Sequence, residues 1–387
     1  MQMKPLFIAI FLTILCNVCH SQNEFSNIAL NKGFIFNVDN ETIISTGEKY
    51  KSGQFAISDA DGNLQIFGDA SRIYDGDGVL LYKCDIEHGR SSISWVVADS
   101  KNKNQFYVFN SYEKIGAPAM YQYYTVISHY FVINIDEGTY VIDEKIVNMY
   151  GDSLYYDSFF DTSCVLTHPD GDKIWFVIRN GMESFTSYLI YEGNVVKKMS
   201  SIIQITGRTD SDSKLPLKTN PRQTAIFLPN GCILDFNNRT GELKENNKFK
   251  IPEEVTSFEF SQSGEYLFGT KRNDDFLTIS RYYVSQLEQG ITDNEDILYK
   301  EKLEMSGRTT LRGWMNLFRH PNSSIYFFCY NNYISKVDAP DSSTPVFVPK
   351  AIKLPSKLAS AIPFHHCLIL SPIIPCTAPP APRIIPE

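Results

Sequence analysis

The sequence predicts an all-β protein, a β-propeller of about seven blades that are each a four-stranded antiparallel sheet. Short runs of β-branched and aromatic residues recur along the chain, and Asp-Gly, Asn-Gly and Ser-Gly pairs separate them. Helical periodicity is nearly absent, and the best helix candidate is the short segment 284–289 (VSQLEQ). The 22 Tyr and 26 Phe residues suit pleated, half-buried surfaces, so they favour strands throughout.

The first 21 residues are typical of a secretory signal peptide. Lys4 supplies the positive charge, and the apolar run at 6–15 is too short to span a bilayer. Cys19 and Ser21 are small residues suitably placed for cleavage before Gln22. The alternative is a lipoprotein signal with Cys16 or Cys19 acylated, although large residues precede both cysteines. We therefore expect a protein that is secreted or held in the cell envelope.

Charge and hydropathy restrict the partners of the mature chain. The formal net charge of the full sequence is -8, and loss of Lys4 with the leader makes the mature chain more negative. No basic cluster interrupts this charge, so nucleic acid is not an expected ligand. No later apolar run is long enough for a transmembrane helix.

Six cysteines follow the leader, and export would permit disulfides. Four of them are far apart and three of these lie in apolar, strand-like runs, where we expect buried free thiols. The last two are close enough to close a short loop in the C-terminal segment. The six are Cys84, Cys164, Cys232, Cys329, Cys367 and Cys376.

One local pattern recurs: an apolar pair, a turn rich in Ser, Thr, Pro and Gly, and an aromatic strand. Each copy predicts a hairpin, and a second hairpin often follows, as at 130–147 and 233–243. Two hairpins make a four-stranded sheet, and radial repetition of such sheets protects their edges. The copies are 55–67, 165–177, 225–236, 258–269 and 317–328, with a looser one at 95–109.

The spacing of these turns is uneven. It is about 33 residues between Gly231 and Gly264 and nearly 70 between Lys103 and Gly171, whereas a regular blade takes about 40 to 50. We expect the long gaps to hold a blade whose signature has decayed. Two β-sandwich domains are the structural alternative.

Proline marks the predicted domain boundary. We place the signal peptide at 1–21, the propeller at 22–339 and a proline-rich tail or linker at 340–387. Proline cannot donate to a strand ladder, so the tail is predicted to be extended. Its segment 364–374 is apolar enough to dock on the domain or on a partner.

The repeats resemble those of a known family. The block THPDGDKIW at 167–175 resembles the SPDG-type repeat of TolB-like and WD40-like propellers, and SQSGEYL at 261–267 resembles a degenerate copy. The segment 55–81 is similar to the opening blade of secreted PD40-type propellers common in Bacteroidetes. The resemblance spans 27–340 and implies a secreted repeat propeller. Its motifs are structural and therefore indicate fold rather than function.

Two clusters contain metal-type ligands. Asp59, Asp61 and Asn63 alternate in SDADGN, with Asp75 and Asp77 nearby, and such oxygen ligands are typical of a calcium site. The EF-hand pattern fails here, and Asp and Asn in a hairpin turn bond their own backbone, which is the interpretation that we favour. His365, His366, Cys367 and Cys376 could bind zinc, although a loop or a local disulfide is the simpler interpretation.

Other candidate residues favour structure or binding over catalysis. His168 and His320 precede proline in two of the repeats, so we interpret them as hairpin residues. Tyr121, Tyr123 and Tyr124, in the aromatic stretch 112–130, could form a binding surface or belong to a strand. Signatures of serine hydrolases, zinc proteases and nucleotide-binding enzymes are absent, so we assign no catalytic, cofactor-binding or metal residue and expect no cofactor.

The function predicted from these observations is that of a non-catalytic binding or scaffold propeller. It would present its loops to a protein or glycan partner. The alternative is a glycan-active hydrolase or lyase that works in the central pocket of the propeller, where two carboxylates about 5 to 10 Å apart would be needed.

Overall fold

The computed structural model describes most of the chain between residues 26 and 355, and residues 367–369. The gaps are 31–32, 48–53, 60, 70, 84–90, 103, 116–123, 137, 151–162, 180–182, 205–216, 229–231, 273–275, 303–315, 321–323 and 329–332. The signal peptide prediction, the His365 and His366 pair and Cys376 therefore lie outside the described residues. None of the described helices is long and apolar enough to cross a membrane.

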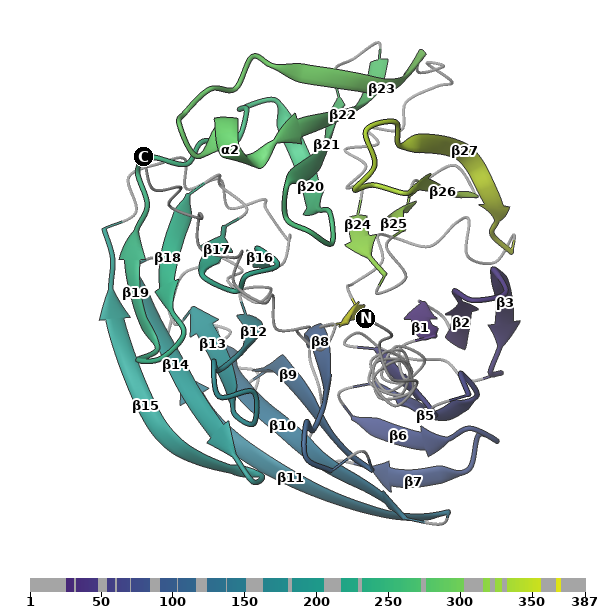
Figure 1. Cartoon of the computed structure of the whole chain (residues 1–387). Helices are drawn as coiled ribbons and strands as arrows, with labels where there is room; N and C mark the ends of the chain where they lie inside the picture. The colour runs from purple at the N-terminus through teal and green to yellow at the C-terminus, as the bar shows by residue number, and fades with distance from the viewer. Residues whose placement is uncertain are drawn as a thin grey trace, which may run out of the picture.

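The described strands form seven sheets that are arranged radially around a common axis (Figure 1). Apart from β28 in blade 3, each sheet is one stretch of chain whose strands follow one another outward from the axis (Figure 1). The prediction of an all-β, seven-bladed propeller is confirmed. Five blades have four strands, whereas blade 1 has three and blade 3 has a fifth strand added.

Blades 1 to 3 contain the N-terminal strands. Blade 1 is β1 (Asn27–Leu30), β2 (Phe34–Asn37) and β3 (Thr42–Ser45). Blade 2 is β4 (Phe55–Ser58), β5 (Leu64–Gly68), β6 (Arg72–Asp75) and β7 (Leu80–Lys83). Blade 3 is β8 (Ser91–Ala98), β9 (Gln105–Ile115), β10 (Tyr124–Asp136) and β11 (Thr139–Tyr150), with β28 (Cys367–Ile369) beside β8.

Blades 4 to 7 complete the ring. Blade 4 is β12 (Ser163–Thr167), β13 (Ile174–Arg179), β14 (Ser184–Tyr191) and β15 (Asn194–Ile202). Blade 5 is β16 (Lys218–Thr219), β17 (Ala225–Phe227), β18 (Ile233–Asn237) and β19 (Glu242–Glu245). Blade 6 is β20 (Val255–Phe260), β21 (Tyr266–Arg272), β22 (Phe276–Tyr283), α2 (Val284–Leu287) and β23 (Glu295–Lys302). Blade 7 is β24 (Asn316–Arg319), β25 (Ile325–Phe328), β26 (Tyr333–Asp338) and β27 (Val346–Lys353).

The structure differs from the prediction in where the seventh blade comes from. The long gap before Gly171 does not hide a blade, because it is filled by the long strands β9, β10 and β11, of 11, 13 and 12 residues. The additional sheet is blade 1, at the start of the described chain, and it has no hairpin of the recurring type.

The C-terminal segment also differs from the predicted tail. β27 belongs to blade 7, although it lies beyond the boundary expected at 340, and it contains Pro349. It is the outermost strand of its sheet, and a proline is tolerated there because one side of an edge strand needs no ladder donor. Further on, β28 pairs in parallel with β8, while every other described strand pair is antiparallel.

Apolar side chains between neighbouring sheets form the core. Blade 1 packs on blade 7 through a cluster that includes Phe36 and Tyr326, whose ring centroids lie 5.5 Å apart. The Lys336 ammonium of blade 7 also forms an ion pair with the Glu41 carboxylate of blade 1, with 2.6 Å between nitrogen and oxygen. Burying one large apolar side chain stabilises the folded state by about 1.5–3 kcal/mol. The cluster between blades 1 and 7 contains several such side chains, so their packing holds the first and last blades together and closes the ring.

The antiparallel order also determines where the turns lie. The first and third strands of every blade run toward the same side of the ring, because successive strands alternate in direction. Turns from the first to the second strand (1–2 turns) therefore share one side of the molecule with turns from the third to the fourth strand (3–4 turns). We call this side the turn face.

Candidate functional site

In blades 4 and 7, a histidine amide closes the 1–2 turn with a hydrogen bond across it. In blade 4, the His168 amide donates to the Lys173 carbonyl at 2.9 Å, and the Gly171 amide donates to the His168 carbonyl at 2.8 Å. In blade 7, the His320 amide donates to the Ser324 carbonyl at 2.9 Å. The interpretation of both histidines as hairpin residues is therefore confirmed. Gly171 has a φ of +78°, a conformation that side chains disfavour.

Blade 5 has the same turn without its glycine. The Asn220 amide donates to the Ala225 carbonyl, the Gln223 amide donates to the Asn220 carbonyl at 2.9 Å, and Gln223 has a φ of +54°. The predicted equivalence of 225–236 with the other repeats is wrong, because that segment joins the second and third strands, β17 and β18. When the blade 5 turn is placed at Gln223 instead of Gly231, its distance along the chain from the blade 6 turn at Gly264 approaches the roughly 40 residues of a regular blade.

The aspartates that were weighed as calcium ligands bind their own turns. One carboxylate oxygen of Asp59 accepts the amides of Asp61 at 2.9 Å and Asn63 at 2.8 Å, and the other accepts the Asn63 side chain at 3.1 Å. Likewise, one carboxylate oxygen of Asp75 accepts the backbone amides of Asp77 at 3.1 Å and Val79 at 2.8 Å. These contacts support the turn interpretation. Among the described residues, no group of three or more His, Cys, Asp or Glu side chains is placed to hold a metal ion.

The structure describes the side chains of two of the cysteines, Cys164 and Cys232. Cys164 is a fully buried free thiol, and burial raises its pKa. Cys232 is half-buried and its thiol forms no disulfide, and burial is also the largest cause that raises its pKa. The free-thiol prediction is confirmed for these two. Cys84, Cys329, Tyr121 and Tyr123 lie outside the described residues, while Tyr124 begins β10 and Cys367 begins β28.

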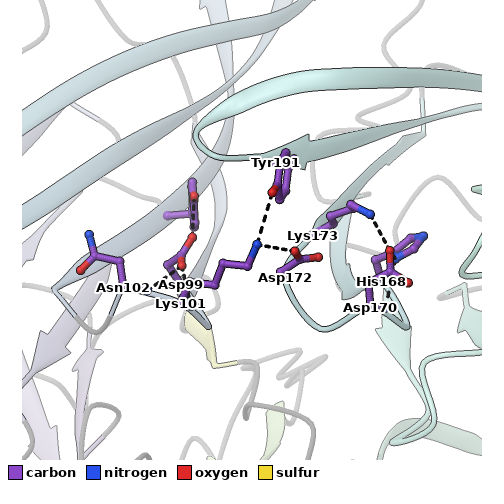
Figure 2. A network of polar contacts seen from close by, with 9 residues as sticks. Asp99, Lys101, Asn102, His168, Asp170, Asp172, Lys173 and Tyr191 are labelled. Atoms are coloured by element: carbon purple, nitrogen blue, oxygen red, sulfur yellow. Dashed lines mark hydrogen bonds and ion pairs between the residues drawn. The ribbon is translucent and has the colours of Figure 1, made fainter.

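A polar network joins the 1–2 turns of blades 3 and 4 (Figure 2). The Lys101 ammonium lies 2.6 Å from an Asp172 carboxylate oxygen and 3.2 Å from the Tyr191 hydroxyl. The ammonium groups of Lys101 and Lys173 lie 4.9 and 5.7 Å from the centroid of the Tyr191 ring. The hydrogen bond from Lys101 lowers the pKa of Asp172, so this carboxylate stays ionised and paired.

His168, at the edge of this network, is held neutral. Burial is the largest cause that lowers its pKa, and its Nδ1 accepts the Asp170 amide at 3.2 Å. An exposed ion pair such as that of Lys101 with Asp172 adds little to stability, because water and salt screen it. The network is therefore a charge-balanced border between two blades.

A pocket of about 530 Å³ lies between blades 5 and 6. It is formed by the 1–2 turns of both blades, by α2 and by the segment that follows β19. The two turns meet at Gly264, where an added Cβ would lie 3.3 Å from the Pro221 ring. Pocket and network thus both involve 1–2 turns on the turn face, at different blade borders.

Aromatic side chains form the inner wall of the pocket. Phe227 lies 5.0 Å from Phe260 and 5.2 Å from Phe249 between ring centroids, and all three are buried. Nearer the solvent, the rings of Tyr266 and Tyr283 lie 5.3 Å apart, and Tyr283 is 44% exposed.

Charged side chains of both signs also line the pocket. Besides Asp235, whose carboxylate accepts the Asn246 side-chain amide at 2.7 Å, the lining has two exposed cations and two exposed anions. The cations are Arg222 and Lys248, and the anions are Glu265 and Glu288. Within the described part of the chain, none of these four forms an ion pair. The pocket can therefore offer hydrogen-bond donors and acceptors to a ligand without first breaking an internal pair.

Sequence reasoning did not find this pocket. Its walls come from 220–227, Asp235, 246–249, 260–266 and 283–288, which no local motif connects. The one available signal was Asn220-Pro221, which corresponds to His168-Pro169 in blade 4 and would have revealed the blade 5 turn.

Comparisons with known proteins give only distant likenesses. No family model and no curated protein matches the chain. A candidate 6-phosphogluconolactonase from Bacteroides fragilis shares 15% identity at a TM-score of 0.46, covering 85% of this chain and 94% of that one. A candidate 6-phosphogluconolactonase from Bacteroides uniformis shares 12% identity at a TM-score of 0.45, and the match covers 85% of this chain and 96% of that one. TolB from Acinetobacter baumannii shares 11% identity at a TM-score of 0.31, and the match covers 83% of this chain and 76% of that one. Similarities at this level carry no argument about activity or ligand.

Proposed function

We propose that this chain is an exported, non-catalytic binding propeller that holds a glycan or protein partner on its turn face. The pocket between blades 5 and 6 is the observation that carries this proposal. Its volume of about 530 Å³ is typical of ligand sites, which span roughly 300–1,000 Å³. The exposed Tyr283 lines it together with four charged side chains that form no ion pair within the described part of the chain, and this combination suits recognition.

Export rests on the leader-like segment at 1–21. Cell fractionation tests it, with the chain expected in the envelope or medium fraction. Retention of the uncleaved chain in the cytoplasm would contradict it.

The alternative enzyme would need carboxylates at the axis that are available for chemistry. Glu259, on the innermost strand β20, is not available in this way. One of its carboxylate oxygens accepts the Lys218 ammonium at 2.7 Å, and the other accepts the Phe260 amide at 3.0 Å. This carboxylate is structural, so Glu259 gives no support to the enzyme alternative.

Hydrogen–deuterium exchange on the full chain tests the binding proposal. The chain would be compared alone, with envelope glycans and with envelope proteins. We expect a ligand to protect peptides covering 217–228 and 283–290. Protection confined to the innermost strands, or to the side opposite the turn face, would contradict the proposal.

A further inference from the structure

We infer that the pocket between blades 5 and 6 is a saccharide subsite that takes a short, uncharged oligosaccharide. This inference rests on the proposed function and adds the ligand class to it. Three features of the pocket carry it: the exposed Tyr283 ring beside Tyr266, the mixed charges, and the pairing on both sides of the blade 5 strands that line it.

The tyrosines provide a surface for sugar rings. Tyr283 is 44% exposed, and its ring lies at 56° to that of Tyr266. The Arg281 guanidinium lies 4.7 Å from the Tyr266 centroid and helps to fix that ring. A tyrosine combines an apolar face with a polar hydroxyl, and a pyranose combines an apolar C–H face with a rim of hydroxyls. The two surfaces are therefore complementary.

The charges favour a neutral ligand over an ion. Arg222 and Lys248 can only donate hydrogen bonds, whereas Glu265 and Glu288 can only accept them. An anionic ligand would face three carboxylates, because Asp235 also lines the pocket, and a cationic ligand would face the two cations. A hydroxyl both donates and accepts, so a neutral polyhydroxylated ligand can satisfy both sets through charge-assisted hydrogen bonds.

The pocket offers little to an extended peptide. Peptides commonly add a strand to an open sheet edge or insert apolar anchors into a groove. β17 and β18 are each paired on both sides, so these walls have no open edge. Phe227 and Phe260 are 1% and 0% exposed, so the buried aromatic wall leaves no apolar slot for an anchor.

A glycan microarray followed by calorimetry on the full chain tests the inference. The probes are neutral gluco-, manno- and N-acetylglucosamine oligosaccharides, with acidic saccharides and a peptide library beside them. We expect a neutral oligosaccharide to bind, and Tyr283→Ala or Arg222→Ala to weaken it about tenfold, equivalent to roughly 1.4 kcal/mol. The matched controls Tyr191→Ala and Lys101→Ala, at the border of blades 3 and 4, should leave the affinity unchanged. Both pocket residues are exposed, and thermal melting checks that the variants stay folded.

The outcomes separate the ligand class from the proposed function. If only acidic saccharides or peptides bind, and Tyr283→Ala weakens them, the saccharide inference is overturned while the binding function stands. If no probe binds, or the pocket variants change no binding, the inference also fails. If exchange additionally shows no protection on the turn face, the proposed function fails with it.

Discussion

The side chain of Trp175 in blade 4 occupies the space beside Gly241 in blade 5, where a Cβ would lie only 2.5 Å from its ring carbons. The indole Nε1 donates to the Asn238 carbonyl at 2.7 Å. Lys197 supports the same 3–4 turn by donating to the Thr240 carbonyl at 3.0 Å. One tryptophan thus couples two blades by fitting against a turn that requires glycine.

Gly241→Ala should therefore destabilise the protein strongly. Gly241 has a φ of +80°, so alanine would add backbone strain to its clash with Trp175. We expect a loss of about 2 kcal/mol or more in the free energy of unfolding. Urea denaturation measures it. Gly78→Ala is the control, because Gly78 also has a positive φ but open space around it. An equal loss in both variants would contradict the packing argument.

A buried ion pair links the inner strands of blades 5, 6 and 7. The Lys218 ammonium lies 2.7 Å from both the Glu259 carboxylate and the Leu317 carbonyl. Lys218→Met should cost roughly 3–5 kcal/mol in unfolding free energy, because it leaves the Glu259 charge buried without its cation. The double variant with Glu259→Gln should recover part of that loss. A double variant as unstable as the single one would show that the pair's charge is not the cause.

Glu295 in blade 6 should make stability depend on pH in the acid range. Burial alone would raise the pKa of its carboxyl, but hydrogen bonds from Lys271 and Tyr282 outweigh burial and lower it below the usual 4.5. The pairing therefore stabilises the fold fully above that value, and this contribution is lost as pH falls through the lowered pKa. Glu295→Gln should flatten the decline in urea midpoint between about pH 6 and about pH 3. An unchanged slope would contradict this assignment.

Cys164 should resist modification while the protein is folded. Its side chain is 0% exposed, and burial raises the pKa of its thiol, which disfavours the reactive thiolate. Iodoacetamide at neutral pH should leave it unlabelled until denaturant is added, as peptide mass spectrometry can show. Rapid labelling of the native chain would mean that β12 is accessible, contrary to the fold.

The sequence was sufficient to predict the fold class because each hairpin carries a local signal. Glycine at Gly62, Gly171 and Gly264 marks turns whose φ is positive. The blade 5 turn was missed because Gln223 adopts the same conformation without being glycine. The end of the propeller was placed too early because Pro349 argues against a strand, except at a sheet edge, which only the topology reveals.

The pocket could not be predicted from the sequence for a different reason. Arg222, Lys248, Glu265 and Tyr283 come from separate turns and loops, and only the packing of blade 5 on blade 6 brings them together. Their residue types are ordinary for surface turns. By contrast, the aspartates that did form a motif, at Asp59 and Asp75, serve their own turns.

A crystal structure of the full chain with the tightest-binding neutral oligosaccharide tests the central claim most directly. The account predicts sugar density between blades 5 and 6, with a ring against Tyr283 and hydroxyls within hydrogen-bond distance of Arg222 and Glu265. Density at the axis of the propeller, with the sugar between two carboxylates and the pocket empty, would contradict it and favour the enzyme.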